Sequence, residues 1–365
     1  MTGAGDRFMR AALLLGNGGP DMLQIRDDVP VPEPRPHEAL IEVAACGMNN
    51  TDINTRVGWY SRSVTGATTG EGFAEASVDD ATWGRGGLTF PRIQGADVVG
   101  RVVAVGMESA QPLVGRRVLI DPWIRDPDDP ADRSLAGYLG SEYDGGFAEY
   151  CAVPTSNVHP IDADLSDAEL ATFACSWSTA EHMLQRIQLA AGQSVAVAGA
   201  SGGVGSALVQ LAKRRGAQVI AVAGSAKLDQ VSRLGADEVV AREVADVPGA
   251  VIDANGGPVS AVADVVGGDD FAGWLDALQR GGRYVTSGAI AGPLVELDLR
   301  TLYLNDLELY GATVFEPKVF ADLVGYIEAG EVRPVLGGTF PLEKIQQAQE
   351  VFARKEHLGS LVLAL

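Results

Sequence analysis

The sequence contains little cysteine and no long apolar run. Its three cysteines, Cys46, Cys151 and Cys175, lie far apart, which indicates a reducing environment without a disulfide framework. No apolar stretch is long enough to be a membrane span. The apolar stretch before Gly16 is too short for a secretory signal. These absences predict a cytoplasmic protein without a membrane segment.

Basic residues are also scarce, because 28 Lys and Arg stand against 48 Asp and Glu and give a formal net charge of −20. Nucleic acids and anionic membrane surfaces are bound by basic patches, so we expect neither as a partner. The four histidines have no metal-binding motif around them. The expected partner is therefore a small-molecule substrate.

Glycine is abundant, and its most informative cluster lies in Gln193–Ala207. A short apolar run opens this stretch and predicts a strand, and apolar residues at helical spacing follow the glycines. Strand, glycine turn and helix together hold a dinucleotide pyrophosphate, because the backbone can approach the phosphates and the first helical amides point at them. The residues expected to bind it are Gly199, Ser201, Gly202, Gly203, Val204 and Gly205.

The chain divides into two parts of different character. Residues 9–153 read as short strands broken by Gly and Pro, which predicts an irregular β-barrel-like domain. After Pro154 strands and helices alternate, which predicts a doubly wound parallel sheet. The fold class is therefore α/β, with a first domain at 1–154 and a nucleotide-binding domain at 155–312. Residues 313–365 are expected to return to the first domain and complete it.

The expected elements of the second part follow from this alternation. Strands are predicted at Val195–Ala198, Gln218–Ala223, Glu238–Val240, Ala261–Val266, Arg283–Ser287 and Leu307–Ala312, and helices at Ser166–Gln188, Lys227–Leu234, Phe271–Gln279 and Lys318–Ala329. Two inserts interrupt the first part. Ser61–Arg92 is rich in Gly, Thr and Ser, and Pro122–Tyr143 carries an acidic run that predicts a solvated surface loop. Both are expected to border the mouth of the cleft.

The residues after the second strand of the parallel sheet indicate which nucleotide is bound. An NAD site usually has an Asp or Glu there for the ribose hydroxyls, but Ala223 is followed by Gly224 and Ser225. Two cations, Lys227 and Arg242, come next. A missing carboxylate with two cations suits a 2′-phosphate, so NADPH (NADP) is favoured, with Ser225, Lys227 and Arg242 as binding residues. The alternative is that both cations are solvated surface residues.

With these motifs in place, nearly the whole chain resembles the medium-chain dehydrogenase/reductase superfamily. The landmarks are ACGMNNTDI (Ala45–Ile53), GADVVGRVVAVG (Gly95–Gly106), GRRVLID (Gly115–Asp121), DGGFAEY (Asp144–Tyr150), STA (Ser178–Ala180) and GASGGVG (Gly199–Gly205). The resemblance implies a GroES-like catalytic domain, a Rossmann domain and a cleft between them for the nicotinamide. Gly288 and Ala289, which follow a Rossmann strand, would then face the carboxamide.

The zinc enzymes of this superfamily have metal ligands in the first two landmarks and a third ligand just before the STA landmark, and this sequence departs from them. The corresponding positions are Asn49, Ala96 and Cys175. A catalytic zinc needs three protein ligands and a water, which one thiol and one neutral amide cannot supply. The four-cysteine structural zinc lobe would fall in Pro122–Tyr143, which has no cysteine. We therefore expect no metal, and Cys175 is expected to line the cleft.

The first landmark is more similar to the zinc-free quinone reductases and enoyl-thioester reductases, which have N-x-x-D followed by G-x-Y. Asn49, Asp52, Gly58 and Tyr60 match this pattern. The resemblance implies that Asn49 lies near the nicotinamide ribose and that Tyr60 is the proton donor. Hydride addition to an activated C=C bond creates an enolate that needs a hydrogen-bond donor and a proton. Tyr60, Asn49 and Thr179 are the candidate catalytic residues, and simple loop packing is the alternative for Tyr60.

The sequence leaves three functions open. The first is an NADPH-dependent, zinc-free reductase of activated C=C bonds or quinones. The second is the alcohol dehydrogenase or carbonyl reductase reaction of the zinc enzymes, and the third is nucleotide binding without catalysis. Because members of the superfamily commonly pair along the strand Leu307–Ala312, we also expect a homodimer.

Overall fold

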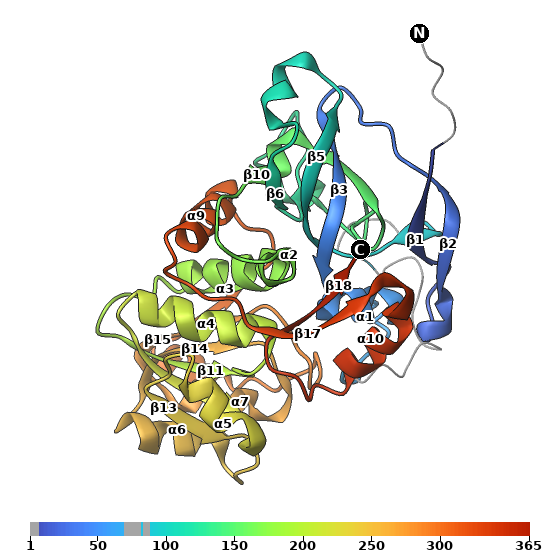
Figure 1. Ribbon diagram of the computed structural model, residues 1–365. Coiled ribbons are helices and arrows are strands. Elements are labelled where there is room, and N and C mark those ends of the chain that lie inside the picture. The colour runs from blue at the N-terminus through green and yellow to red at the C-terminus, as the bar shows by residue number, and fades with distance from the viewer. Residues whose placement is uncertain (1–6, 69–81, 83–87) are drawn as a thin grey trace.

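The computed structural model describes residues 7–68, 82 and 88–365, and these residues form two domains (Figure 1). The upper domain in Figure 1 consists mainly of strands, and the lower domain is a parallel sheet flanked by helices. The predicted α/β class, with a GroES-like domain and a Rossmann domain, is confirmed. Most of the insert Ser61–Arg92 lies outside the described residues.

The first domain contains two larger sheets and a short hairpin. Its elements are β1 (Phe8–Leu14), β2 (Leu23–Pro30), β3 (Glu38–Gly47), α1 (Asn50–Val57), β4 (Arg92–Ile93), β5 (Asp97–Val105), β6 (Arg117–Ile120), β7 (Trp123–Ile124), β8 (Gly137–Tyr138), β9 (Tyr150–Pro154), β10 (Val158–Pro160), α2 (Asp167–Leu170), β17 (Leu336–Pro341), α10 (Ile345–Ala353) and β18 (Ser360–Ala364). The larger sheet has the order β10-β6-β5-β3-β18-β17, and β9 also pairs with β3. The smaller sheet has the order β2-β1-β4. A Cβ at Gly100 would lie 2.1 Å from the Glu42 carbonyl oxygen, so the close approach of β5 to β3 requires glycine there.

The second domain is the parallel sheet that the alternating pattern predicts. Its strands are β11 (Ser194–Ala198), β12 (Gln218–Ala223), β13 (Glu238–Ala241), β14 (Val259–Asp264), β15 (Leu278–Thr286) and β16 (Glu308–Gly311), in the order β13-β12-β11-β14-β15-β16. Its helices are α3 (Ala174–Arg186), α4 (Gly203–Arg214), α5 (Leu228–Ser232), α6 (Val247–Asn255), α7 (Phe271–Asp276), α8 (Leu299–Leu304) and α9 (Pro317–Glu328). β11 is buried along its whole length, as expected for a central strand covered on both faces. One face packs on α3 and α4, and the other packs on α6 and α7.

The helix predicted over Ser166–Gln188 is in fact two helices, α2 and α3. The Thr172 hydroxyl donates to the Glu169 carbonyl at 2.8 Å at the end of α2. The buried carboxylate of Asp97 accepts a hydrogen bond from the backbone N–H of Cys175, also at 2.8 Å, at the start of α3. The Asp97 side chain, from the first domain, thus binds the Cys175 amide and marks the start of a second helix. The spacing of apolar residues in the sequence does not show this contact.

From β17 on, the C-terminal segment lies in the first domain, whereas α9, which also belongs to the predicted segment 313–365, packs against α3 in the second domain. β18 pairs antiparallel with β3, with Val362 opposite Gly47, and pairs parallel with β17. Figure 1 shows the segment, in red, crossing from the Rossmann domain to the strands of the upper domain. The helices α6, α8 and α10 are short and were not expected from the sequence.

The insert Pro122–Tyr143 is only partly the solvated loop that its acidic run predicts. Residues 127–135 are exposed, but residues 122–124 and 137–141 are buried, and Trp123 and Tyr138 are each 4% exposed. These two aromatic residues face each other across the β7–β8 pair, with ring centroids 4.7 Å apart. The prediction is therefore wrong at the ends, because burial of two aromatic side chains outweighs the polarity of the middle.

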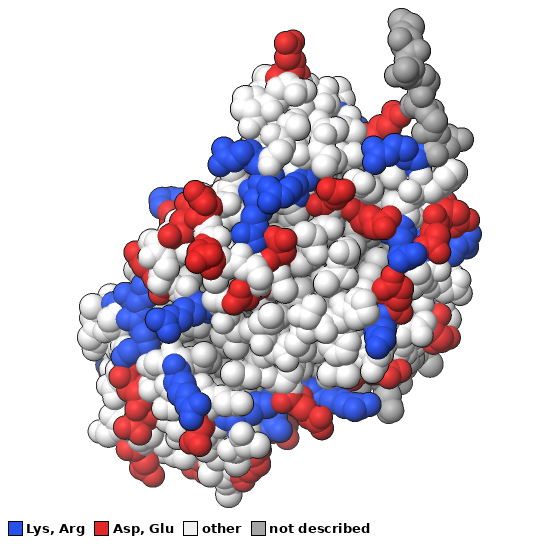
Figure 2. Space-filling view, viewed as in Figure 1, with Lys and Arg blue, Asp and Glu red and all other residues white. Residues whose placement is uncertain are grey.

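In the part of the chain that the structure describes, no helix combines the length and apolar character needed to cross a bilayer. On the face in Figure 2, acidic and basic side chains are interspersed. Among the residues described on that face, the figure therefore shows no extended surface of one charge.

Candidate active site

A cavity of about 470 Å³ lies where the two domains meet. Its wall is formed by the start of α1, the first turns of α3, the glycine turn before α4 and the residues that follow β15 and β16. None of the described residues that line it carries a formal charge. A cavity of this kind suits an uncharged ligand group held by hydrogen bonds.

The glycine turn forms one wall of the cavity as the sequence predicts. Five of its six predicted residues line the cavity: Gly199, Gly202, Gly203, Val204 and Gly205. Gly199 has φ +79°, and a Cβ at Gly205 would lie 2.1 Å from the Gly199 carbonyl oxygen. The turn can therefore fold back on itself only with glycine at these positions. This cradle of backbone amides fits a pyrophosphate.

Ser201, the sixth predicted residue of the turn, lies elsewhere. It is not among the residues that line the cavity, and its carbonyl accepts a hydrogen bond from the Gly359 N–H at 2.9 Å. The turn is thus joined to the segment just before β18.

The residues that follow β15 form another part of the wall. Gly288 and Ala289, predicted to face the carboxamide, line the cavity together with Ser287 and Ile290. The backbone N–H of Thr68 donates to the Ile290 carbonyl at 2.8 Å. This bond brings the start of the first insert to the cavity, as expected from the sequence.

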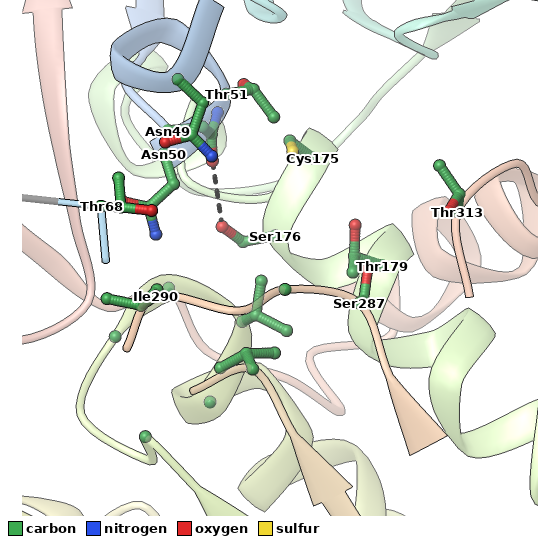
Figure 3. A pocket seen from close by; sticks show the side chains of 18 of the residues that line it. Asn49, Asn50, Thr51, Thr68, Cys175, Ser176, Thr179, Ser287, Ile290 and Thr313 are labelled. Atoms are coloured by element: carbon green, nitrogen blue, oxygen red, sulfur yellow. Dashed lines mark hydrogen bonds between the residues drawn. The ribbon is translucent and has the colours of Figure 1, made fainter. Parts of the chain in front are cut away.

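Asn49 lies at the start of α1 and is held by both domains. Its backbone N–H donates to Asp52 at 2.7 Å, and its side-chain oxygen accepts a hydrogen bond from Ser176 Oγ on α3 at 3.2 Å (Figure 3). By distance and angle the buried Nδ2 of Asn49 has no hydrogen-bond partner among the described residues, although a contact of this side chain lowers the pKa of the buried Asp97 carboxyl. Next to a cavity, such a donor can also serve a ligand acceptor.

Two more residues of α1 line the cavity with polar atoms that lack a partner. Thr51 Oγ1 and Asn54 Oδ1 are both buried, and neither has a hydrogen-bond partner among the described residues. Together with Asn49 they give the start of α1 a polar but uncharged surface at the cavity. The sequence motif indicated Asn49 but gave no signal for Asn54.

Tyr60 also lines the cavity, next to Trp59. The two rings meet edge to face at 5.8 Å and 76°. Burial raises the pKa of the Tyr60 hydroxyl above its ordinary value, although a hydrogen bond with Asn54 opposes this shift. The hydroxyl therefore stays protonated through the ordinary pH range and is a proton donor, not a base.

Thr179 and Cys175 line the cavity from α3, and Figure 3 shows Thr179 beside Ser287. Burial raises the pKa of the Cys175 thiol, so this sulfur is protonated and a weak nucleophile. A hydrogen bond with Tyr138 acts in the opposite direction on this thiol. Tyr138 and its neighbour Trp123 line the cavity as well. Tyr138 was not expected from the sequence, although an aromatic residue near each end of a polar insert is the signal that could have indicated it.

The residues at the three zinc-ligand positions do not fit a catalytic zinc. Ala96 has no ligand atom, and Asn49 and Cys175 remain as a neutral amide and a protonated thiol. Asp97, next in sequence, binds the Cys175 backbone, and burial raises the pKa of its carboxyl to about 7. Among the described residues, no three His, Cys, Asp or Glu side chains gather as a metal site.

The predicted phosphate-binding residues lie together after β12 and β13, but they have partners within the chain. Lys227 Nζ donates to the carbonyls of Lys355 at 2.6 Å and His357 at 2.8 Å. Ser225 and Arg242 both bind the carboxylate of Glu243. The sequence analysis expected no carboxylate at this position.

Lys355 is a further cation that the sequence gave no reason to select. Its Nζ donates to Asn50 Oδ1 at 2.6 Å and lies 3.7 Å from the centre of the Phe352 ring. Burial lowers the pKa of this ammonium group to about 7, and the charge of Lys227 contributes. A buried cation near a second cation favours an anionic ligand, because such a ligand would stabilise both charges.

Comparisons with known proteins agree with this geometry. Residues 35–163 match the family model for the alcohol dehydrogenase GroES-like domain, and residues 203–329 match the model for zinc-binding dehydrogenase. The chain is 30% identical to the quinone oxidoreductase of Lama guanicoe, over 99% of this chain and 98% of that protein. It is 27% identical to an NAD-dependent alcohol dehydrogenase of Sulfurisphaera tokodaii, over 97% and 99% of the two chains. A crystal structure of a putative alcohol dehydrogenase from Sinorhizobium meliloti 1021 is 47% identical, with a TM-score of 0.89 and coverage of 99% and 98%.

Proposed function

This chain belongs to the medium-chain dehydrogenase/reductase superfamily and is an oxidoreductase, and we propose that it uses NADPH to reduce an activated C=C bond or a quinone without zinc. The observation that carries this proposal is the neutral cavity, in which the Asn49 amide and the Cys175 thiol stand at two of the zinc-ligand positions and Ala96 occupies the third. The similarity to quinone oxidoreductases supports it.

The proposed cofactor site extends from the glycine turn to the residues after β12 and β13. When bound, NADPH supplies a hydride to the β-carbon of an activated C=C bond or to a quinone. Gly203 and Val204, the first residues of α4, would hold the pyrophosphate through their backbone amides, and Gly288 and Ala289 would adjoin the carboxamide. Lys227 and Arg242 are the proposed partners of the 2′-phosphate.

The proposed chemistry needs a group that manages negative charge on the substrate. Addition of a hydride leaves this charge on the substrate oxygen, and the reduced product then takes up a proton. Tyr60 is the proposed donor, because this residue lines the cavity and burial keeps its hydroxyl protonated. Asn49 Nδ2 and the Thr179 hydroxyl would orient the substrate carbonyl or the nicotinamide ribose.

Reduction of an aldehyde or ketone is the second candidate, supported by the similarity to proteins named as alcohol dehydrogenases. The test is to purify the protein without chelators, measure bound metal, and assay an enone, a quinone and an aldehyde with NADPH and with NADH. We expect less than about 0.1 zinc per chain and turnover of the enone or quinone with NADPH. Stoichiometric zinc with turnover of the aldehyde alone would contradict the proposal.

We propose a homodimer formed along the open edge of the parallel sheet. β16 pairs only with β15 among the described strands. Large apolar side chains are exposed on β16 and just before it: Leu294, Val295, Leu297, Leu299, Tyr303, Leu304 and Leu309. An open strand edge beside exposed apolar side chains suits a second copy of the same strand.

Charge in this apolar surface is expected to separate the two copies. The double substitution Tyr303→Glu and Leu304→Glu places two carboxylates where the side chains are now 63% and 56% exposed. Light scattering should give twice the chain mass of 38.1 kDa for the parent protein and 38.1 kDa for the variant. Leu135→Glu, at a residue 51% exposed in the first domain, is the matched control and should stay dimeric. A monomeric parent protein would refute the dimer.

A further inference from the structure

The carboxylate of Glu243 lies among the groups assigned to the 2′-phosphate. Its Oε2 accepts hydrogen bonds from the Ser225 N–H at 3.0 Å and from Ser225 Oγ at 2.7 Å. Its Oε1 accepts from Arg242 Nε at 3.2 Å. Three donors from two segments, one after β12 and one after β13, therefore converge on one side-chain anion.

This cluster sits directly against the end of β12. A Cβ at Gly224 would lie 3.4 Å from Glu243 Oε1 and 3.6 Å from Arg242 Nε. The Arg242 charge also contributes to lowering the pKa of Lys227, after burial, so the two cations are close in space. The position that follows the second strand of a Rossmann sheet is where the adenosine ribose is recognised.

The donors around Glu243 are those that a phosphate monoester would use. A backbone N–H, a hydroxyl and a guanidinium nitrogen each donate to phosphate oxygens in proteins. Hydrogen bonds from Ser225 lower the pKa of Glu243, so this side chain is ionised at neutral pH. The Glu243 side chain is 50% exposed and can turn into solvent without disturbing the core.

We propose that Glu243 is a specificity-determining residue whose carboxylate occupies the 2′-phosphate position and has to leave it when NADPH binds. This inference rests on the proposed NADPH site. The resident anion pre-aligns Ser225 and Arg242 but competes with the ligand for them. A nucleotide without the 2′-phosphate does not need these donors, so Glu243 narrows the preference for NADPH over NADH.

The test compares nucleotide binding to the parent protein and to Glu243→Gln, which keeps the side-chain shape and removes the charge. Calorimetric titrations use NADPH, NADH, adenosine 2′,5′-bisphosphate and adenosine 5′-monophosphate. We expect NADPH and the bisphosphate to bind about tenfold more tightly to the variant, because repulsion between two anions is removed. Affinities for NADH and the monophosphate should change by less than about twofold.

Two further variants make the comparison specific. Glu243→Ala removes the side-chain partner that Ser225 and Arg242 have at position 243. Like Glu243→Gln, it should bind NADPH and the bisphosphate more tightly than the parent protein does. Glu238 is an exposed carboxylate at the other end of β13. Glu238→Gln removes the same charge far from Ser225 and should change the affinity for none of the four nucleotides.

The result that would overturn the inference is a bisphosphate affinity that does not rise in either Glu243 variant. Weaker NADH binding in Glu243→Gln would overturn it as well, because Glu243 would then bind the ribose hydroxyls directly. These measurements need no turnover. Failure of the proposed reaction would instead appear in the substrate assays of the parent protein, so the two outcomes are distinguishable.

Discussion

Replacing Tyr60 with phenylalanine is expected to lower kcat for the enone or quinone about a hundredfold, in the range that a general acid contributes. The Kd for NADPH should stay within about twofold of the parent value, because the ring remains beside Trp59 and only the hydroxyl is lost. Stopped-flow measurement of NADPH oxidation in single turnover checks the rate, and fluorescence titration checks the affinity.

The matched control for this experiment is Tyr138→Phe, which removes the other tyrosine hydroxyl in the cavity. Tyr138 is 4% exposed and interacts with Cys175, so we expect its loss to slow turnover by less than about fivefold. A parent-like rate in Tyr60→Phe would remove Tyr60 from the mechanism. If the large decrease appeared in Tyr138→Phe instead, the proton donor would be Tyr138.

Lys227→Glu is expected to weaken NADPH binding about a hundredfold and NADH binding less than about threefold, because a charge facing the 2′-phosphate is reversed. The difference should shrink as salt is raised, since screening reduces the interaction between exposed charges. Titration of both cofactors at low and at high ionic strength measures this effect.

Lys227 also binds the carbonyls of Lys355 and His357, so the substitution has a second effect that needs a control. Lys227→Met removes these hydrogen bonds without adding a negative charge. We expect it to weaken NADPH about tenfold and to leave NADH nearly unchanged. Equal weakening of both cofactors in both variants would show that Lys227 acts by holding the C-terminal segment and not by binding phosphate.

The parts of the fold that could be predicted from sequence are those whose signals are local. The strand Gln218–Ala223 agrees with β12 residue for residue, and Glu238–Val240 ends one residue before β13 does. The glycine turn was predictable because strand, turn and helix are adjacent in sequence and each has its own pattern. Short helices such as α6 were missed, because two turns give little periodicity.

The parts of the site that could not be predicted depend on contacts between distant segments. Tyr138 reaches the cavity because its insert folds back on Trp123. The acidic run between these two residues instead predicted a solvated loop. Glu243 is three residues beyond the end predicted for its strand, and only the fold brings it against Ser225. Lys355 joins the cations through a turn after α10, more than a hundred residues from Lys227.

The position of β18 has a consequence for how the protein is made. This strand lies between β3 and β17 in the larger sheet, although about 300 residues separate it from β3. At roughly 5–20 residues per second on the ribosome, β3 emerges tens of seconds before its neighbour exists. During that time the part of its edge at Ala45–Gly47, where β18 later pairs, is available to strands of other nascent chains, whereas β9 can already cover Glu38–Glu42. The domain that is translated first is thus the last to be completed, and chaperones have the longest access to it.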